Sequence, residues 1–89
     1  MSTLKIALLK LNPKTDFIFQ VKDEEVVRVK GEQHSKFLND CKDVAKENGL
    51  KKGLIYGLKG ANGKIKVQTS SGIPSSVAQR IRNVWSFYT

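Results

Sequence analysis

The chain has very little of the chemistry that catalytic and metal sites require. Its 89 residues contain one cysteine, Cys41, and one histidine, His34. A single cysteine excludes an internal disulfide, and these two side chains are too few for a structural zinc site. No nucleophile with a base, and no pair of carboxylates, stands at a spacing typical of catalysis. We therefore predict that the protein is not an enzyme and that it uses no metal and no cofactor.

Long apolar runs are also missing. A membrane-spanning helix needs roughly 18 consecutive apolar residues, and the best candidate, LKIALLKL at residues 4–11, is short and is interrupted by Lys5 and Lys10. The stretch lacks a cleavage site of small residues, so it does not resemble a signal peptide. The expectation is a soluble cytoplasmic protein.

Acidic residues are absent from the second half of the chain. All eight acids lie within residues 1–47, where nine bases leave a net charge of +1. Residues 48–89 carry seven bases and no acid, and the whole chain has a net charge of +8. A half-chain at +7 creates a field that favours polyanions. The alternative is that the excess of lysine serves solubility alone.

What the sequence does contain is an internal repeat. In each half, two segments of alternating apolar residues are joined by a turn and followed by an apolar stripe with helical spacing. The first unit spans residues 16–49 and the second 53–88; Phe17 corresponds to Leu54, an offset of 37 residues. Asn62-Gly63 between two alternating segments is a strong hairpin signal.

Neither unit can bury its apolar face alone, so we expect the two to pack together. We predict an α+β fold of tandem ββα units, forming a two-layer sandwich with an antiparallel sheet of four to five strands and two helices on one face. Residues 13–89 form this single domain. Residues 1–12 are an N-terminal extension that forms either an extra strand or a short helix, and Asn12-Pro13 separates it from the rest.

The helix ends can be placed by their capping residues. Ser35 is the expected N-cap of the first helix, and Gly49 is suited to the left-handed conformation that ends it. In the second helix, at residues 75–86, Arg80 and Arg82 fall on opposite shoulders of the apolar arc around Ile81. A recognition helix would gather its charge outward, so we interpret this helix as mostly core.

The basic surface is therefore expected on the sheet. The alternation predicts that ten residues face the helices: Phe17, Phe19, Val21, Val27, Val29, Leu54, Tyr56, Leu58, Ile65 and Val67. Six bases then lie on the open face as candidate polyanion-binding residues: Lys22, Arg28, Lys30, Lys59, Lys64 and Lys66. Phosphates need such a surface, but the inward aromatic rings disfavour a platform for stacking single-stranded bases. The alternative is a solvated, lysine-rich sheet face.

Three further features carry weaker hypotheses. Ser70 and Ser71, ahead of the second helix, form a possible anion site on free backbone amides, although a capping loop explains them equally well. Cys41 lies within the apolar stripe of the first helix, where a buried thiol is expected rather than a nucleophile. His34 has no carboxylate or cysteine at a suggestive spacing.

Two stretches carry a family resemblance. IPSSVAQRIRNV, at residues 73–84, resembles the C-terminal signature of a family of short bacterial proteins, a domain of unknown function, and FLNDC, at residues 37–41, resembles its upstream F-x-x-D-C element. The resemblance covers roughly residues 17–88 and implies no activity, cofactor or catalytic residue. Members often begin with a membrane-spanning segment, which would imply membrane association in the natural context; residues 1–12 depart from that pattern.

The leading functional hypothesis is a non-enzymatic module that binds nucleic acid or another polyanion through the sheet face. The alternative is a protein–protein or self-association module whose charge is incidental. It is motivated by the apolar residues 4–11 and by Phe87, which falls away from the helical stripe of Trp85 and Tyr88 and is expected to be exposed. A homodimer through an N-terminal strand would bury such surfaces by edge pairing.

Overall fold

The computed structural model describes residues 2–88, apart from the side chains of Ser2, Thr3 and Lys5. Its seven elements follow in the order α1 (Ser2–Leu11), β1 (Thr15–Lys22), β2 (Glu25–Lys30), α2 (Ser35–Glu47), β3 (Lys52–Lys59), β4 (Ile65–Thr69) and α3 (Ser75–Ser86). The predicted repeat is therefore present, because β1, β2 and α2 are followed by β3, β4 and α3 in the same order.

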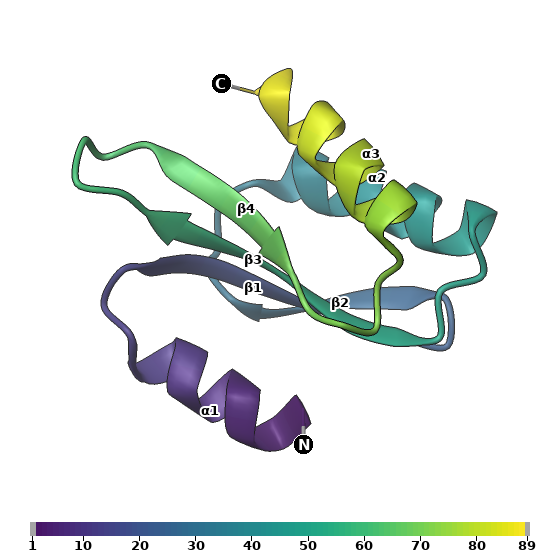
Figure 1. The fold of residues 1–89 in the computed structure, drawn as a ribbon, viewed down its shortest axis with the longest axis horizontal. Helices are drawn as coiled ribbons and strands as arrows, with labels where there is room; N and C mark the ends of the chain where they lie inside the picture. The colour runs from purple at the N-terminus through teal and green to yellow at the C-terminus, as the bar shows by residue number, and fades with distance from the viewer. Residues whose placement is uncertain (1, 89) are drawn as a thin grey trace.

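The four strands form one antiparallel sheet in the order β2-β1-β3-β4. The first strand of each unit lies at the centre, and Phe17 of β1 pairs with Gly57 of β3. Helices α2 and α3 lie together on one face of the sheet (Figure 1), as predicted. The fold is α+β, and its main core lies between this helical layer and the sheet.

Residues 2–11 are helical, and α1 lies on the other face of the sheet, against β1 (Figure 1). Of the two alternatives for this segment, the helix is therefore the one that forms. The prediction of a fifth strand was wrong for the described residues, and a homodimer through an N-terminal strand lacks the strand it requires. Helix α1 ends at Leu11. The N–H of the following Asn12 donates to the carbonyls of Leu8 and Leu9, and its Oδ1 accepts from the N–H of Lys14.

The facing of β3 differs from the prediction by one residue. Leu54, Tyr56 and Leu58 lie on the face toward α1, and Ile55 faces the helical layer instead. The reason is glycine: a Cβ on Gly57 would lie 2.3 Å from Cε2 of Phe17. The inward positions on this strand are kept small so that bulky core side chains can approach its backbone.

The facing of β2 is also shifted. Asp23 and Glu24 form a two-residue turn with φ of 49° and 66°, which makes Val21 and Val26 cross-strand partners. Cross-strand partners share a face, so Val26 joins Val21 in the core, whereas Val27 is 52% exposed. The prediction that Val27 and Val29 face the helices was wrong for this reason.

The predicted capping residue is confirmed at the C-terminus of α2 and wrong at its N-terminus. Gly49 follows the helix with φ 60°, as expected. The N-cap is His34, in the left-handed conformation at φ 68°, rather than Ser35. The hydroxyl of Ser35 instead accepts a hydrogen bond from the Arg28 guanidinium at 3.2 Å. Arg80 of α3 forms an ion pair with Glu47 of α2, which joins the two helices.

Candidate functional site

Lysines gather at one end of the sheet, where β1 and β4 begin, β2 and β3 end, and α1 also ends (Figure 1). We call this set the basic end: Lys10, Lys14, Lys30, Lys59, Lys64 and Lys66. The topology creates it, because an antiparallel sheet returns every second strand terminus to the same edge. Five of the six side chains are exposed, and Lys30 is partly buried.

Backbone pairing holds these residues next to one another. The N–H of Lys59 donates to the carbonyl of Lys14 at 2.8 Å, and Lys66 stands one residue from the cross-strand partner of Lys59. The ammonium of Lys30 reaches the last turn of α1, where it lies 3.5 Å from the carbonyl oxygen of Lys10. The lysines of three strands and one helix therefore gather at one end of the sheet, where Lys59 shares the helical face with its partner Ile65 and Lys66 shares the α1 face with its partner Leu58.

The charge balance differs between the two ends of the sheet. The segments that build the basic end, residues 10–16, 28–34 and 58–66, contain seven bases and two acids. One acid, Asp16, is already in contact with Lys59, whose Nζ lies 3.8 Å from its Oδ1. The segments at the opposite end, residues 20–27 and 50–54, contain three bases and three acids, including the ion pair of Lys51 with Glu24.

The structure brings together four of the six predicted polyanion-binding residues: Lys30, Lys59, Lys64 and Lys66. It places Lys22 at the opposite end, as the cross-strand partner of Lys52. Arg28 lies at the same end as the four lysines but on the helical side, because it pairs with Phe19, and its guanidinium contacts the carbonyl of Gln33 and Ser35.

Lys10 and Lys14 were not predicted. Both flank the Asn12-Pro13 break. The position of α1 against the sheet brings Lys10 to Lys30, and the pairing of β1 with β3 brings Lys14 to Lys59. The sequence does show one base before the break and one after it. This pattern does not indicate where the break lies relative to the sheet.

Ser70 and Ser71 lie in the loop between β4 and α3. The Ser70 hydroxyl accepts a hydrogen bond from the N–H of Leu54 at 2.8 Å, and Ser71 is exposed. The N-cap of α3 is Pro74, so both serines stand before the helix terminus. The loop therefore ties the end of β4 to β3, and a role in anion binding remains a prediction.

A second feature at the basic end was missed by the sequence analysis. Nε2 of His34 lies 2.7 Å from Oδ2 of Asp16, and the imidazole packs against the rings of Phe17 and Trp85. Asp16 sits where the register of β1 with β3 shifts, which turns its side chain toward His34. The two residues are 18 positions apart in the sequence and come together only in the fold. No local spacing therefore predicts the pair.

The His34–Asp16 pair borders a hollow of about 320 Å³ that is lined by Asp16, Gly31, Glu32 and Gln33. A carboxylate that accepts from an imidazole fixes the orientation of the ring. Within residues 2–88, no group of three or more histidine, cysteine, aspartate or glutamate side chains converges as a metal site would require. The pair thus adds a hydrogen-bonding group beside the lysines.

Cys41 is buried in α2, as expected. Burial raises the pKa of its thiol to about 12, and the neighbouring Asp40 carboxylate adds to the rise. Thiolate is the nucleophilic form, so this cysteine is protonated and unreactive at neutral pH. Asp40 also accepts a hydrogen bond from the Tyr88 hydroxyl, which raises the pKa of that phenol.

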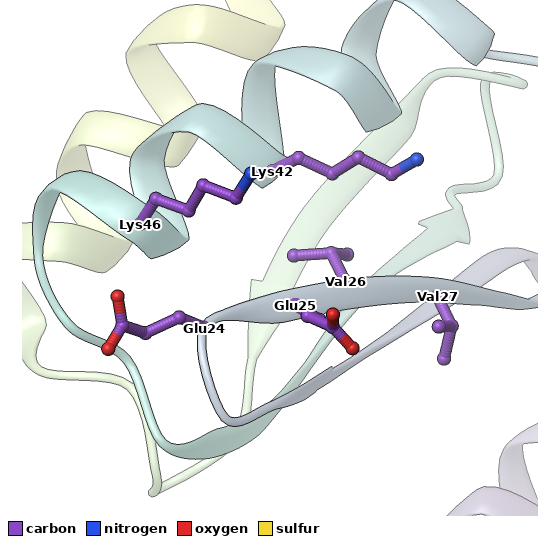
Figure 2. Close-up of a pocket in the computed structure, with 6 residues that line it drawn as sticks. All are labelled: Glu24, Glu25, Val26, Val27, Lys42 and Lys46. Carbon is purple, nitrogen blue, oxygen red and sulfur yellow. The ribbon is translucent and has the colours of Figure 1, made fainter.

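A second hollow, of about 260 Å³, lies between α2 and the edge strand β2. Figure 2 shows Lys42 and Lys46 extending from α2 above the strand, with Glu24 and Glu25 at the start of β2. Two bases face two acids here, and Val26 and Val27 form the remaining wall. Because its charges balance, this hollow does not extend the basic surface.

A family model described as Protein of unknown function (DUF3634) matches residues 4–89, so the chain belongs to that family. The expectation of a family of unknown function is thereby confirmed. No curated protein and no solved structure matches the chain. None of the helices within residues 2–88 has the length and apolar character needed to cross a membrane.

Proposed function

We propose that this member of the DUF3634 family is a binding module that contacts the phosphate backbone of nucleic acid through the basic end. The observation that carries the proposal is the gathering of six lysines from three strands, α1 and the adjoining turns at one end of the sheet. Lysine ammonium groups bind phosphates as point charges and release counterions when they do so.

The proposed contact is to the backbone rather than to bases. Phe17 and Phe19 are completely buried in the core, so they do not offer the exposed stacking platform that single-strand binders use. A lysine surface with no such platform recognises charge density, so duplex should bind at least as tightly as single strand, and both affinities should fall as salt is raised.

The His34–Asp16 pair lies beside the lysines of the basic end, because Asp16 also contacts Lys59. It joins the start of β1 to the N-cap of α2, and His34 and Lys59 are two partners of the Asp16 carboxylate. Because the Asp16 carboxylate is engaged by the Lys59 ammonium and the His34 imidazole, its negative charge opposes phosphate binding less.

The decisive experiment titrates labelled duplex and single strand at two salt concentrations with two charge-matched double variants. Lys64→Glu with Lys66→Glu alters the basic end, and Lys22→Glu with Lys52→Glu alters two paired lysines at the opposite end. Each variant lowers the net charge by four, so bulk charge is held constant between them.

We expect the Lys64/Lys66 variant to lose about tenfold or more in affinity at low salt and to reduce the salt slope by about two. The Lys22/Lys52 variant should stay within about threefold of the parent, because its charges lie far from the contact. Equal losses in the two variants would mean that net charge alone drives binding, and no binding at low salt would end the proposal.

A further inference from the structure

Strand β2 is an edge of the sheet, and some of its backbone groups face outward. Within residues 2–88 no strand lies beyond β2 in the order β2-β1-β3-β4. Lys22 and Glu25 close a two-residue turn and are therefore a hydrogen-bonded pair. Because the direction of the backbone groups alternates along an antiparallel pair, the N–H and C=O groups of Val26 and Arg28 point away from β1. These groups can pair with another extended backbone.

A hollow borders this edge on the helical side. It is the hollow of about 260 Å³ between α2 and β2, and four consecutive residues, 24–27, line it on the strand side. Lys42 and Lys46 line it on the side of α2, one helical turn apart. Figure 2 shows both lysine side chains extending above the strand. The hollow therefore lies where a strand added to β2 would place its side chains.

The positive charges above β2 are not neutralised by the acids beside them. Lys42 and Lys46 are exposed, and within residues 2–88 neither forms an ion pair, although Glu24 and Glu25 line the same hollow. Glu24 is engaged by Lys51 instead. The α2 side of the hollow is thus a cationic wall that is open to a carboxylate from outside the chain.

Arg28 continues this cationic wall along the strand. It lies on the helical face as the partner of Phe19, and its guanidinium contacts two neutral groups, the Gln33 carbonyl and the Ser35 hydroxyl. Val27 points to the other face and is 52% exposed. Cross-strand partners share a face, so an added strand would place alternate side chains near the cations and the residue between them near Val27.

We propose that β2 binds an extended acidic peptide of another protein, which joins the sheet as an antiparallel fifth strand. The peptide backbone exchanges hydrogen bonds with Val26 and Arg28, which is the usual source of affinity in strand addition. Two acidic side chains, opposite these two residues, face the cationic wall. The residue between the two acids is apolar and covers Val27. The recognised pattern is therefore acidic, apolar, acidic in an extended segment.

This inference goes beyond the proposed function and does not depend on it. The peptide contacts β2 and α2, and it uses none of the six lysines of the basic end. Peptide binding is measured without nucleic acid, so its failure and the failure of phosphate binding are separate results.

The experiment is an NMR titration of the full chain with the acetylated, amidated peptide STEVETS. Its two glutamates flank one valine, so it carries the pattern in a single register. We expect a dissociation constant on the order of 100 µM, because a short free peptide loses much conformational entropy on binding. The backbone amide signals of Val26 and Arg28 should shift most. No shift at millimolar peptide would overturn the proposal.

Two charge-matched double variants test the cationic wall. Lys42→Gln with Lys46→Gln should weaken peptide binding about fivefold or more, because both replaced lysines line the hollow. Lys64→Gln with Lys66→Gln removes the same charge from the basic end and should change the affinity less than about twofold. The replaced lysines of α2 are exposed, so the fold should persist, and the dispersion of the amide signals verifies this. Equal losses in the two variants would mean that the peptide recognises net charge alone.

Methylation of the peptide backbone tests the strand pairing without altering the protein. N-methylation of either glutamate removes a donor that faces β2 and should weaken binding about tenfold or more. N-methylation of the valine removes a donor that faces away, and binding should stay within about threefold. Equal losses at the valine and the glutamates would overturn the proposal. So would shifts of the β2 amide signals with the concentration of the protein alone, because a second copy would then cover this edge.

Discussion

The two ends of the sheet are built from the same strands and carry different charge. At the basic end, seven bases accompany two acids, and at the opposite end three bases accompany three acids. Both ends contain cross-strand neighbours and tight turns, so secondary structure does not distinguish them. The difference lies in which residues flank the turns: Asp23 and Glu24 form the turn at one end, and uncharged residues 60–63 form the turn at the other.

The comparison teaches that a net charge of +8 is not spread evenly over the fold. At the opposite end of the sheet, acids stand beside the bases, as in the Lys51–Glu24 pair. At the basic end, where the lysines of β3, β4 and α1 meet, acids are scarce. A polyanion would approach the second region, because an electrostatic field steers by local rather than total charge.

The largest expected effect comes from disrupting the packing beneath the basic end. Gly57→Val adds a side chain whose Cβ alone would lie 2.3 Å from the Phe17 ring and 2.8 Å from Ile65. Because Phe17 is held in the core by His34, Phe37 and Trp85, it cannot move aside, and we expect a loss of about 3 kcal/mol in the free energy of unfolding.

Chemical denaturation measures this loss, and Gly60→Ala in the exposed turn is the control. Its Cβ would meet the Asn62 side chain at 3.3 Å and the Lys64 carbonyl oxygen at an ordinary contact distance of 3.6 Å, so its stability should change little. A Gly57→Val protein as stable as the control would show that β3 does not pack against Phe17 as described.

A smaller effect should separate stability from binding at the basic end. Asp16→Asn removes the carboxylate that contacts His34 and Lys59, and the partly buried His34 loses a charge-assisted hydrogen bond. We expect the free energy of unfolding to fall by about 1–2 kcal/mol, while the affinity for nucleic acid rises about twofold because a negative charge has gone.

Glu32→Gln provides the matched comparison, since it removes an exposed acid from the same end without touching His34. Its stability should equal that of the parent, and its affinity should rise to a similar extent. If Asp16→Asn weakened nucleic-acid binding instead, the pair would be contributing to the contact directly.

The smallest effect is expected at the opposite end. Lys51→Ala breaks the ion pair with Glu24, in which both side chains are largely in water. Exposed pairs of this kind contribute roughly 0–1 kcal/mol, so we expect a change below about 0.5 kcal/mol. Thermal unfolding at low salt measures it, with Lys52→Ala as the reference. A loss above about 1 kcal/mol in the free energy of unfolding would mean that this ion pair contributes more to stability than an exposed pair does.

The sequence was informative where structure is local. The tandem ββα order, the two helices on one face, the turn at Asn62-Gly63 and the end of α2 at Gly49 all follow from short-range patterns and were predicted correctly. The exposure of Phe87 also followed from its angle on the helix.

The errors have physical causes that a pattern of apolar residues does not contain. The alternation of Leu54, Tyr56 and Leu58 is real, but Gly53 and Gly57 take the inward positions because the core needs space there. An absent side chain can therefore mark the buried face of a strand. The two-residue turn at Asp23–Glu24 shifted β2 in the same way, by fixing which residues are partners.

The candidate site was partly predictable for a different reason. Lys59, Lys64 and Lys66 belong to one hairpin, and their proximity follows from its turn. Lys10, Lys14 and the contact between Asp16 and His34 depend on packing between elements that are distant in sequence. Charge composition indicates that a basic surface exists, and only the topology determines which residues form it.

The central pairing of β1 with β3 makes the chain a single cooperative system despite its repeat. Each ββα unit supplies one strand to the middle of the sheet, so separating the units would expose Phe17, Ile18 and Ile55 together. There is no linker at which one unit can open while the other stays folded. Unfolding should therefore be all-or-none, and any ligand held at one edge of the sheet stabilises both units equally.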